Sequence, residues 1–188
     1  MGLSAVNGYS SFHQHNGSIM TTVPDEHREQ APRQVACAVV TVSDTRTVDT
    51  DLGGRTAVAL LEAAGHRILV REILPDEPEQ LAKLLRVLCG RSDIAAVLLT
   101  GGTGIGVRDQ TFETLMGLLD KPLPGYGELF RMLSFEEIGP AAMLSRATGG
   151  VLSRTVVLSM PGSPAAVRLA LEKLILPELG HLVREARR

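Results

Sequence analysis

The feature that most restricts the fold of this sequence is its regular alternation of short apolar runs and amphipathic helical segments. Residues 35–44, VACAVVTVSD, form a run rich in β-branched residues without alternation, which is typical of a strand buried on both faces of a parallel sheet. A helical pattern then spans 53–65, a second strand 66–74, a second helix 78–90 and a third strand 94–102. Strands joined by such helices require right-handed crossovers that cover both faces of the sheet. The sequence therefore predicts an α/β fold, a three-layer α/β/α sandwich around a mainly parallel, mixed sheet.

The second half of the chain is less regular. It predicts two further helices, two short strands and a long C-terminal helix, in the segments 111–120, 125–139, 148–160 and 163–188. Ser153 and Arg154 lie near the turn between the two strands. Pro177 lies within the last helical pattern, where its missing N–H predicts a bend.

The length of the chain suits one domain with a tail. Of the 188 residues, we expect 34–188 to form the domain and 1–33, rich in Ser, Asn, Gly, Gln and His, to form a flexible tail. His13 and His15 lie in this tail. Because two tail histidines are more often solvated than metal-bound, we favour solvated side chains over a metal site.

Charge and hydropathy argue against several function classes. The formal net charge of −2 gives no indication of a nucleic-acid or anionic-membrane partner, and 3% aromatic residues without Trp provide no platform for stacking bases. No apolar run approaches the roughly 18 residues of a membrane span, and the N-terminus has no signal-peptide pattern, so we expect a cytoplasmic protein. Cys37 and Cys89 lie far apart in apolar stretches, which indicates buried free thiols rather than a disulfide or a zinc site.

The stretch LLTGGTGIGVRDQT, residues 98–111, is the strongest local indication of a ligand. It lacks the Lys-Ser/Thr of a Walker-A loop, and Val107 replaces the last glycine of a dinucleotide-binding fingerprint. Bare backbone N–H groups, with the hydroxyl of Thr103, could cradle an anion beside the next helix. A merely tight connection usually needs one or two glycines, so four within six residues favour ligand contact. These glycines are Gly101, Gly102, Gly104 and Gly106.

Two aspartates lie beside the predicted strand ends, and each has two interpretations. Asp109 could cap the following helix or pair with Arg108, or it could hold magnesium between itself and a bound phosphate. Asp76 begins a capping-box-like stretch with Glu79 three residues later, and spacing alone favours a helix cap.

Two further loops follow predicted strands and face the same edge of the sheet. Ser43 and Asp44 end the first strand and could bind either the following turn or a ligand. Ser163 is a plausible helix N-cap because a proline follows it. Pro161 and Gly162, just before it, would form a rigid, bare wall beside a pocket.

Five blocks of the chain, taken in order, resemble the MogA/MoaB family of molybdenum cofactor biosynthesis proteins, which is related to the G domain of gephyrin and its plant counterpart. The blocks are VSDTRTVDTDLGG, LPDEP, LLTGGTGIGVRDQT, LPGYGELFRMLSFEEIGPAAMLSRATGG and MPGSPAAVRLALEKLILPELGHL. The resemblance covers about residues 35–182, and the sequence GELFRMLSFEEIG is more similar to the MoaB branch.

The resemblance implies a molybdopterin-binding α/β/α domain that assembles as homotrimers or as hexamers built from trimers. It also implies adenylylation of molybdopterin, in which the terminal phosphate of molybdopterin attacks the α-phosphate of Mg-ATP and pyrophosphate leaves. Hand-over to other proteins of the pathway is implied too. No Gly-x-Ser-x-Gly elbow is present, and transfer between two phosphates needs a cation and N–H donors rather than a protein nucleophile.

On matching positions, the resemblance implies that Asp76 and Asp109 bind magnesium or orient the reacting phosphates, which reverses the capping interpretation of Asp76. One position departs from the family pattern, because Phe112 stands where proline is common after the RDxT motif. The residues implied to line the pocket for molybdopterin or nucleotide are Gly101, Gly102, Thr103, Gly104, Ser43, Asp44, Ser145, Pro161, Gly162 and Ser163.

Two other functions stay open at the level of sequence. The protein could bind molybdopterin or a precursor as a carrier without turnover, or it could serve as an oligomeric partner with a vestigial pocket. The presence of both aspartates favours the adenylyltransferase.

Overall fold

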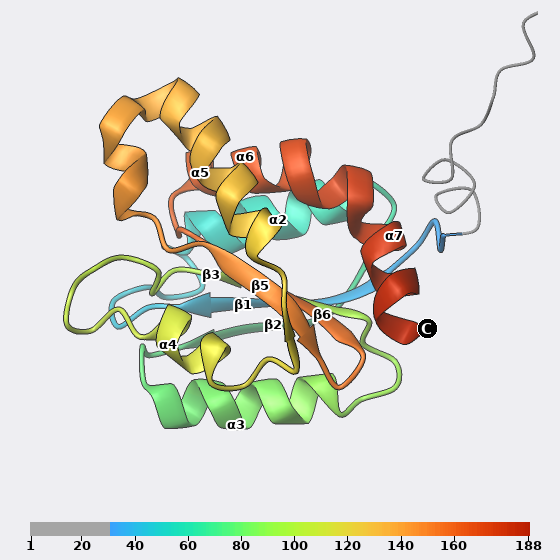
Figure 1. The fold of residues 1–188 in the computed structure, drawn as a ribbon. Coiled ribbons are helices and arrows are strands. Elements are labelled where there is room, and N and C mark those ends of the chain that lie inside the picture. The colour runs from blue at the N-terminus through green and yellow to red at the C-terminus, as the bar shows by residue number, and fades with distance from the viewer. Residues whose placement is uncertain (1–30) are drawn as a thin grey trace, which may run out of the picture.

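The computed structural model describes residues 31–188 (Figure 1). Most of the predicted tail, with His13 and His15, lies outside the described residues. The strands are β1 (Ala36–Val42), β2 (Arg67–Leu74), β3 (Ala96–Thr100), β4 (Lys121–Pro122), β5 (Thr148–Leu152) and β6 (Thr155–Met160). The helices are α2 (Leu52–Ala63), α3 (Pro78–Cys89), α4 (Thr111–Met116), α5 (Pro124–Ile138), α6 (Pro164–Ala170) and α7 (Leu176–Arg187), with a 3-10 segment η1 (Gly139–Leu144) and a π-helical segment η2 (Leu171–Ile175).

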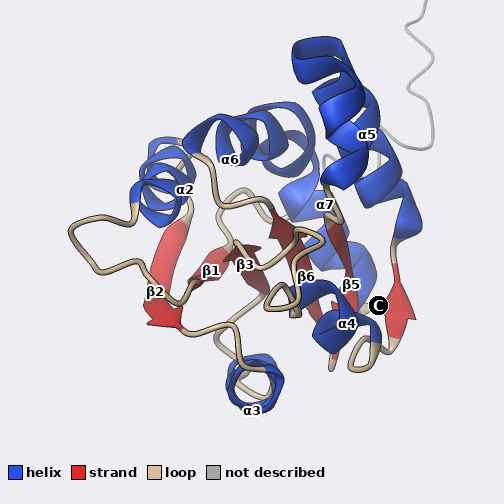
Figure 2. Ribbon diagram, turned by 90° about the vertical axis from the view of Figure 1, so that its left-hand side faces the viewer, coloured by secondary structure: helices blue, strands red, loops and turns tan. Residues whose placement is uncertain are grey.

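One sheet with the strand order β2-β1-β3-β6-β5-β4 forms the middle layer. Strands β2, β1, β3 and β6 run parallel, whereas β5 is antiparallel to both β6 and β4. Figure 2 views the molecule from the end where β1 and β3 terminate, with α2 and α6 above the sheet and α3 below it. The predicted three-layer sandwich with a mainly parallel, mixed sheet is confirmed.

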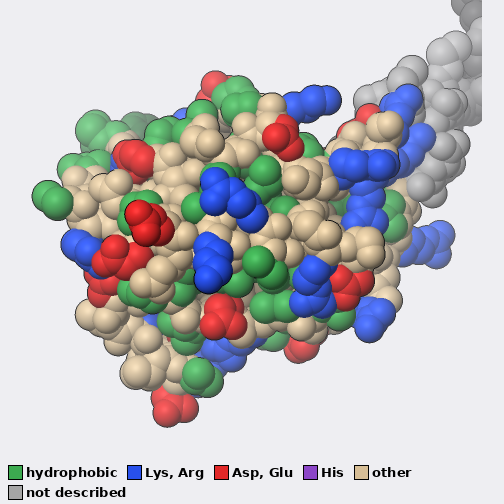
Figure 3. Space-filling view, turned by 90° about the horizontal axis from the view of Figure 1, so that it is seen from below, with side chains coloured by type: hydrophobic (Ala, Val, Ile, Leu, Met, Phe, Trp, Pro, Cys, Tyr) green, Lys and Arg blue, Asp and Glu red, His purple; other side chains and the backbone are tan. Residues whose placement is uncertain are grey.

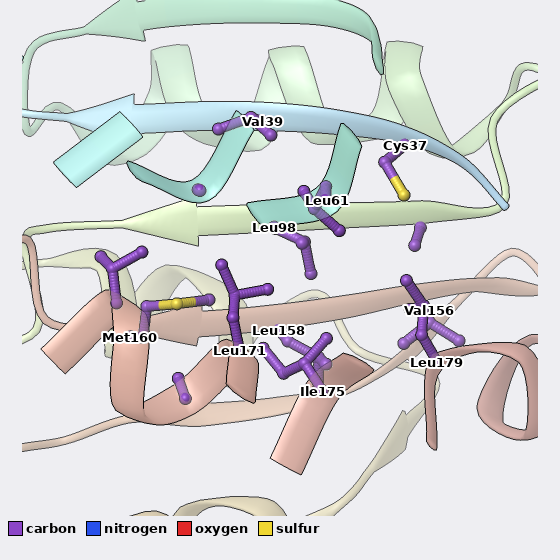
Figure 4. Packing of buried hydrophobic residues seen from close by; sticks show 14 of the residues in the cluster. Cys37, Val39, Leu61, Leu98, Val156, Leu158, Met160, Leu171, Ile175 and Leu179 are labelled. Carbon is purple, nitrogen blue, oxygen red and sulfur yellow. The ribbon is translucent and has the colours of Figure 1, made fainter. Parts of the chain in front are cut away.

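Alternate side chains of the buried strands supply two separate cores. Cys37 and Val39 of β1 join the core under α2, α6 and α7, whereas Ala38 and Val40 join the core above α3. This is the period-2 alternation of a strand that is buried on both faces. Figure 4 shows the first core, where apolar side chains of the sheet lie beside Leu171 of η2. Cys37 and Cys89 are buried free thiols, as expected.

Side-chain caps begin helices α2 and α6, and a glycine follows the end of α2. Asp51 caps α2 by accepting a hydrogen bond from the N–H of Gly54 at 2.8 Å. Ser163 caps α6 by accepting from the N–H of Ala166 at 3.2 Å, which confirms its predicted role. Gly65 follows α2 with a φ of +85°, the left-handed conformation that favours glycine after a helix.

One helix prediction needs correction, and the irregularity predicted at Pro177 takes the form of a π-helical segment. The helix predicted over 111–120 ends at Met116, because the chain leaves the helix and Asp120 donates its N–H to Val151 of β5 at 2.9 Å. The C-terminal helix is interrupted by the π-helical η2 just before Pro177. Since proline lacks the N–H for a regular helical bond, a local change of hydrogen-bond pattern at this point is expected.

The face below the sheet, over α3, carries acidic and basic side chains interspersed with each other (Figure 3). Leu81, Leu85 and Leu88 of α3 point into the core, so the polar face of this amphipathic helix is left to the solvent. Within residues 31–188, no helix combines the length and the apolar character that crossing a membrane requires.

Candidate functional site

Two adjoining cavities lie where the parallel strands end. Their volumes are about 330 and 410 Å³. In open α/β sheets, ligands bind beyond the carboxyl ends of the strands, where the loops diverge. The residues that line both cavities are Gly101, Gly102, Asp109, Gly162 and Ser163.

The structure brings both aspartates and all of the pocket residues that the resemblance implies to one of these two cavities, whereas Gly106 of the glycine loop lines neither. Thr103, Gly104, Ser145 and Pro161 line the smaller cavity. The larger cavity has a different set of predicted residues, namely Ser43, Asp44 and Asp76. Their convergence agrees with the resemblance, and the role of each side chain stays a prediction.

The smaller cavity is bounded on one side by apolar residues that sequence reasoning missed. Phe130 and Ile138 of α5 and Leu144 of η1 line it, together with Ala141 and Ala142. These residues belong to the block LPGYGELFRMLSFEEIGPAAMLSRATGG, but an apolar helical pattern does not reveal which of its residues face a pocket. The larger cavity is polar by comparison, and its lining includes Arg46 and Arg108.

Gly101 and Gly102 adopt positive φ values of 94° and 62°. A Cβ at Gly101 would lie 2.2 Å from the carbonyl oxygen of Val42, so only glycine fits beside β1. No hydrogen bond among residues 31–188 engages the N–H of Gly102, Thr103 or Gly104. These N–H groups are therefore available to an anion. The sequence predicted the same for Gly101 and Gly106, but their N–H groups donate to the carbonyl of Met160 and the carboxylate of Asp109.

Gly104 and Gly106 are glycines for a different reason. Neither has a positive φ. A Cβ at either position would lie less than 3 Å from a carboxylate oxygen of Asp109, at 2.7 and 2.8 Å. The bare backbone at these two positions makes room for the Asp109 side chain.

Asp76 is not a helix cap, which corrects the interpretation from spacing. The N-cap position of α3 is Glu77, without a side-chain hydrogen bond. Asp76 is 6% exposed, and its Oδ1 accepts from the N–H of Gln110 at 3.1 Å. Burial, reinforced by the charges of Asp109 and Asp44, raises the pKa of Asp76 against the opposing effect of the Gln110 hydrogen bond.

Asp109 likewise neither caps α4 nor pairs with Arg108. Gln110 occupies the N-cap position of α4, and the Oδ2 of Asp109 accepts from the N–H of Gly106 at 2.8 Å. Arg108 instead contacts Asp44, at 3.0 Å from both Nε and Nη2, and Glu77 at 2.8 Å. The Asp109 carboxylate thus closes the glycine loop while lining both cavities.

Asp44 holds the loops after β1 and β2 together. Its Oδ1 accepts from the N–H of Asp76 at 3.1 Å, in addition to its contacts with Arg108. Hydrogen bonds from Arg108 hold the pKa of Asp44 below its ordinary value. The neighbouring Ser43 hydroxyl accepts from the N–H groups of Thr45 and Arg46 and so shapes its own turn. Ser43 therefore bonds to the following turn, whereas Asp44 bonds to more distant loops, and ligand contact by either residue stays a prediction.

Two buried hydroxyls beside the site have no hydrogen-bond partner. They are the Oγ1 atoms of Thr100 and Thr111. Both Thr111 Oγ1 and Asp76 Oδ2 lie within 2.5 Å of the position that a Cβ would take at Gly102, so they share one small space. An unpaired buried hydroxyl costs free energy unless something binds it. Sequence reasoning missed both hydroxyls, because burial at a strand or helix end is not visible in a single sequence.

Comparison with known proteins identifies relatives of the whole described domain. The sequence model described as a probable molybdopterin binding domain matches residues 38–181. Molybdenum cofactor biosynthesis protein B of Halalkalibacterium halodurans is 52% identical over 162 residues, which is 86% of this chain and 95% of the relative. A crystal structure of a molybdenum cofactor biosynthesis protein B is 52% identical, covers 85% of this chain and 99% of its own, and superposes with a TM-score of 0.81.

The likeness extends to an archaeal protein. The tungsten cofactor synthesizing protein MoaB from Pyrococcus furiosus is 36% identical, with a TM-score of 0.74, over 84% of this chain and 100% of the archaeal one. Because the matches cover nearly the full length of each relative, they concern the complete domain and both of its cavities.

Proposed function

Because the chain belongs to the MogA/MoaB family of molybdenum cofactor biosynthesis proteins, we propose that it transfers the adenylyl group of ATP to molybdopterin. An oxygen of the molybdopterin phosphate forms a bond to the α-phosphorus of ATP, the bond to the β-phosphate breaks, and pyrophosphate leaves. The observation that carries this proposal is the set of unengaged N–H groups at 102–104 between an apolar cavity and a cavity lined by Asp76 and Asp109.

The glycine loop supplies fixed donors to the reacting phosphates. Oriented N–H groups in a partly enclosed site stabilise developing negative charge without reorganising. Holding the two phosphates in contact converts a reaction between two anions into one within a complex. The apolar wall of Phe130, Ile138 and Leu144 suits a flat heterocycle such as a pterin.

The residues of the larger cavity fit magnesium that is held jointly with a substrate. Within residues 31–188, no group of three His, Cys, Asp or Glu side chains could hold a metal ion alone. Magnesium is commonly bound by one or two carboxylates, waters and substrate phosphates. Asp76 and Asp109 would supply the carboxylates. The unpartnered Thr111 hydroxyl would be free to hydrogen-bond a water or a phosphate oxygen beside the metal. Magnesium bound there would supply positive charge to phosphate oxygens that the carboxylates would otherwise repel.

The raised pKa of Asp76 supports this assignment. A buried carboxylate beside two others gains most from a cation, since the cation relieves both desolvation and repulsion. Asp76 reaches this position through the turn after β2, and the N–H of Gln110 holds one oxygen and leaves the other beside Gly102.

The proposal is tested with the purified full chain, Mg-ATP and molybdopterin, followed by chromatography for adenylyl-molybdopterin. We expect product from the wild type and its loss in Asp109→Asn, because an amide is a poor magnesium ligand yet still accepts the Gly106 N–H. Wild-type rates in Asp109→Asn would overturn the role of Asp109.

A molybdopterin carrier without turnover is the second candidate. It is favoured by the hydrogen bond that the Asp109 carboxylate accepts from the N–H of Gly106. This bond shapes the loop as an anion cradle, whereas a metal ion would compete with it for the same carboxylate. Tight molybdopterin binding without product in the same assay supports the carrier, and product formation excludes it.

A further inference from the structure

Arg146, between η1 and β5, makes three hydrogen bonds to the glycine loop. Its backbone N–H donates to the carbonyl of Thr103 at 3.1 Å. Its guanidinium donates from Nε to the carbonyl of Gly104 and from Nη2 to the carbonyl of Asp109, both at 2.7 Å. One side chain thus joins the two ends of the segment 104–109.

The other side of the same guanidinium contacts α4. Its Nη1 donates to the carboxylate of Glu113, and its Cζ lies 5.3 Å from the centroid of the Phe112 ring. The Arg146 side chain is 24% exposed, so these contacts are partly shielded from water. A guanidinium has the planar fork of donors that such an arrangement requires, and it stacks on aromatic rings.

The tip of the segment is held only by bonds within the loop, from Gly106 to Asp109 and from the Gln110 side chain to the carbonyl of Val107. Ile105 is 70% exposed and Val107 is 93% exposed, so neither side chain packs against the domain. The ends of the segment, Gly104 and Asp109, both line the smaller cavity. Whatever fixes the distance between these ends therefore fixes the geometry of the site.

We propose that Arg146 is the positioning residue of the glycine loop. Its fork holds the carbonyls of Gly104 and Asp109 at a set separation, and thereby holds the Gly104 N–H and the Asp109 carboxylate where the phosphates bind. The role in catalysis rests on the proposed adenylyl transfer, whereas the positioning itself does not. Side chains that orient a site commonly matter almost as much as the groups that they orient.

Phe112 ties the start of α4 to the positioning residue. Its phenyl ring provides a face for the guanidinium of Arg146, at 5.3 Å from the ring centroid to Cζ. The residue that departs from the pattern implied by the resemblance therefore contacts Arg146.

The test compares the wild type with Arg146→Ala, Arg146→Lys and Phe112→Leu by amide hydrogen exchange. We expect exchange in 101–110 to rise about tenfold or more in both Arg146 variants and less in Phe112→Leu, with β1 unchanged. Lysine keeps the positive charge but lacks the planar fork of donors, so it cannot hold the carbonyls of Gly104 and Asp109 together. Arg91→Ala is the matched control, since Arg91 makes a two-pronged pair with Asp93 elsewhere on the surface.

A second readout separates positioning from folding. Each variant is assayed for molybdopterin affinity and for kcat and KM, and we expect kcat to fall by roughly 10- to 100-fold with a smaller change in KM for ATP, as a misplacement of about 1 Å produces. If the wild type makes no product, the proposed function fails, while loop exchange and molybdopterin affinity still decide the role of Arg146. The positioning role of Arg146 would be overturned by wild-type exchange and molybdopterin affinity in Arg146→Ala, or by wild-type values of both in Arg146→Lys.

Discussion

The carboxylate of Asp76 accepts a hydrogen bond from the backbone N–H of Gln110, a residue 34 positions later in the chain, at 3.1 Å. This bond joins the turn after β2 to the start of α4, so the position of Asp76 depends on how the glycine loop folds back. The bond only partly offsets burial, and the pKa of Asp76 stays raised. The site therefore keeps a carboxylate whose ionisation is less favourable in the folded protein than in the unfolded chain.

Asp76→Asn is predicted to remove function while increasing stability at neutral pH. A carboxyl group with a raised pKa in the folded state binds protons more tightly when folded, so its ionisation lowers stability as the pH rises through the folded pKa. Asparagine never ionises, and its side-chain oxygen can still accept from Gln110. Thermal unfolding should give a higher Tm for Asp76→Asn at neutral pH, with molybdopterin adenylylation lower by on the order of 100-fold or more.

The pH dependence provides the control for this prediction. The gain in Tm should vanish below the ordinary pKa of an aspartate, where Asp76 is protonated in both the folded and the unfolded states. A gain that is equal at all pH values would point to packing instead of ionisation. A large fall in Tm with preserved activity would restore a purely structural role for Asp76.

Gly102→Ala is predicted to abolish ligand binding. The new Cβ would lie 2.2 Å from Thr111 Oγ1 and 2.4 Å from Asp76 Oδ2, in the space that the site requires. Gly65→Ala is the matched control, because Gly65 also has a positive φ but nothing lies within 4 Å of its added Cβ. Gly65→Ala should cost only about 1–2 kcal/mol from the left-handed backbone and leave molybdopterin affinity unchanged.

Calorimetric titration with molybdopterin and thermal unfolding distinguish the two glycine variants. Equal affinity in Gly102→Ala and the wild type would mean that the space beside Asp76 is not part of the binding site.

Local sequence patterns predicted those parts of this fold that depend on neighbouring residues. The buried strands β1 and β3 are visible as apolar runs, and the cap at Ser163 depends on the next three residues. Spacing favours a cap for Asp76 and leaves a cap open for Asp109, but their carboxylates accept from the N–H groups of Gln110 and Gly106. The Gln110 bond closes only after the sheet has brought distant loops together, so spacing could not reveal it.

The apolar wall of the smaller cavity shows a second limit. Helix α5 is apolar on more than one side, so its sequence does not separate a core residue such as Tyr126 from a cavity residue such as Phe130 or a surface residue such as Phe135. The motifs of the resemblance carry information that periodicity lacks, and the residues it implies line two cavities at the strand ends, where their roles stay predictions.

Arg108→Gln is predicted to make ligand binding more sensitive to acid. The charge of Arg108 lowers the pKa of Asp76, and Arg108 also neutralises Asp44 and Glu77 beside it. Without this charge Asp76 binds its proton at higher pH, so magnesium-dependent molybdopterin binding should be lost at a higher pH than in the wild type. Since Arg108 is 58% exposed, the difference should shrink at high salt.

Titrations across a pH series at low and high salt check this prediction. Arg168→Gln serves as the control, because it removes an exposed ion pair between Arg168 of α6 and Glu172 of η2. An identical acid midpoint for Arg108→Gln and the wild type would contradict the electrostatic role of Arg108.

Phe135→Glu is predicted to dissociate a homo-oligomer, the trimer or hexamer that the family resemblance implies. Leu129, Met132, Phe135 and Ile138 recur every third residue along α5, and each is about half exposed or more. A stripe of this kind marks an interaction surface, and a charge within it opposes burial. Light scattering should give a multiple of the monomer mass for the wild type and the monomer mass for Phe135→Glu. Val87→Glu, at an equally exposed position on α3, should leave the mass unchanged, whereas a monomeric wild type would refute the assignment of this stripe.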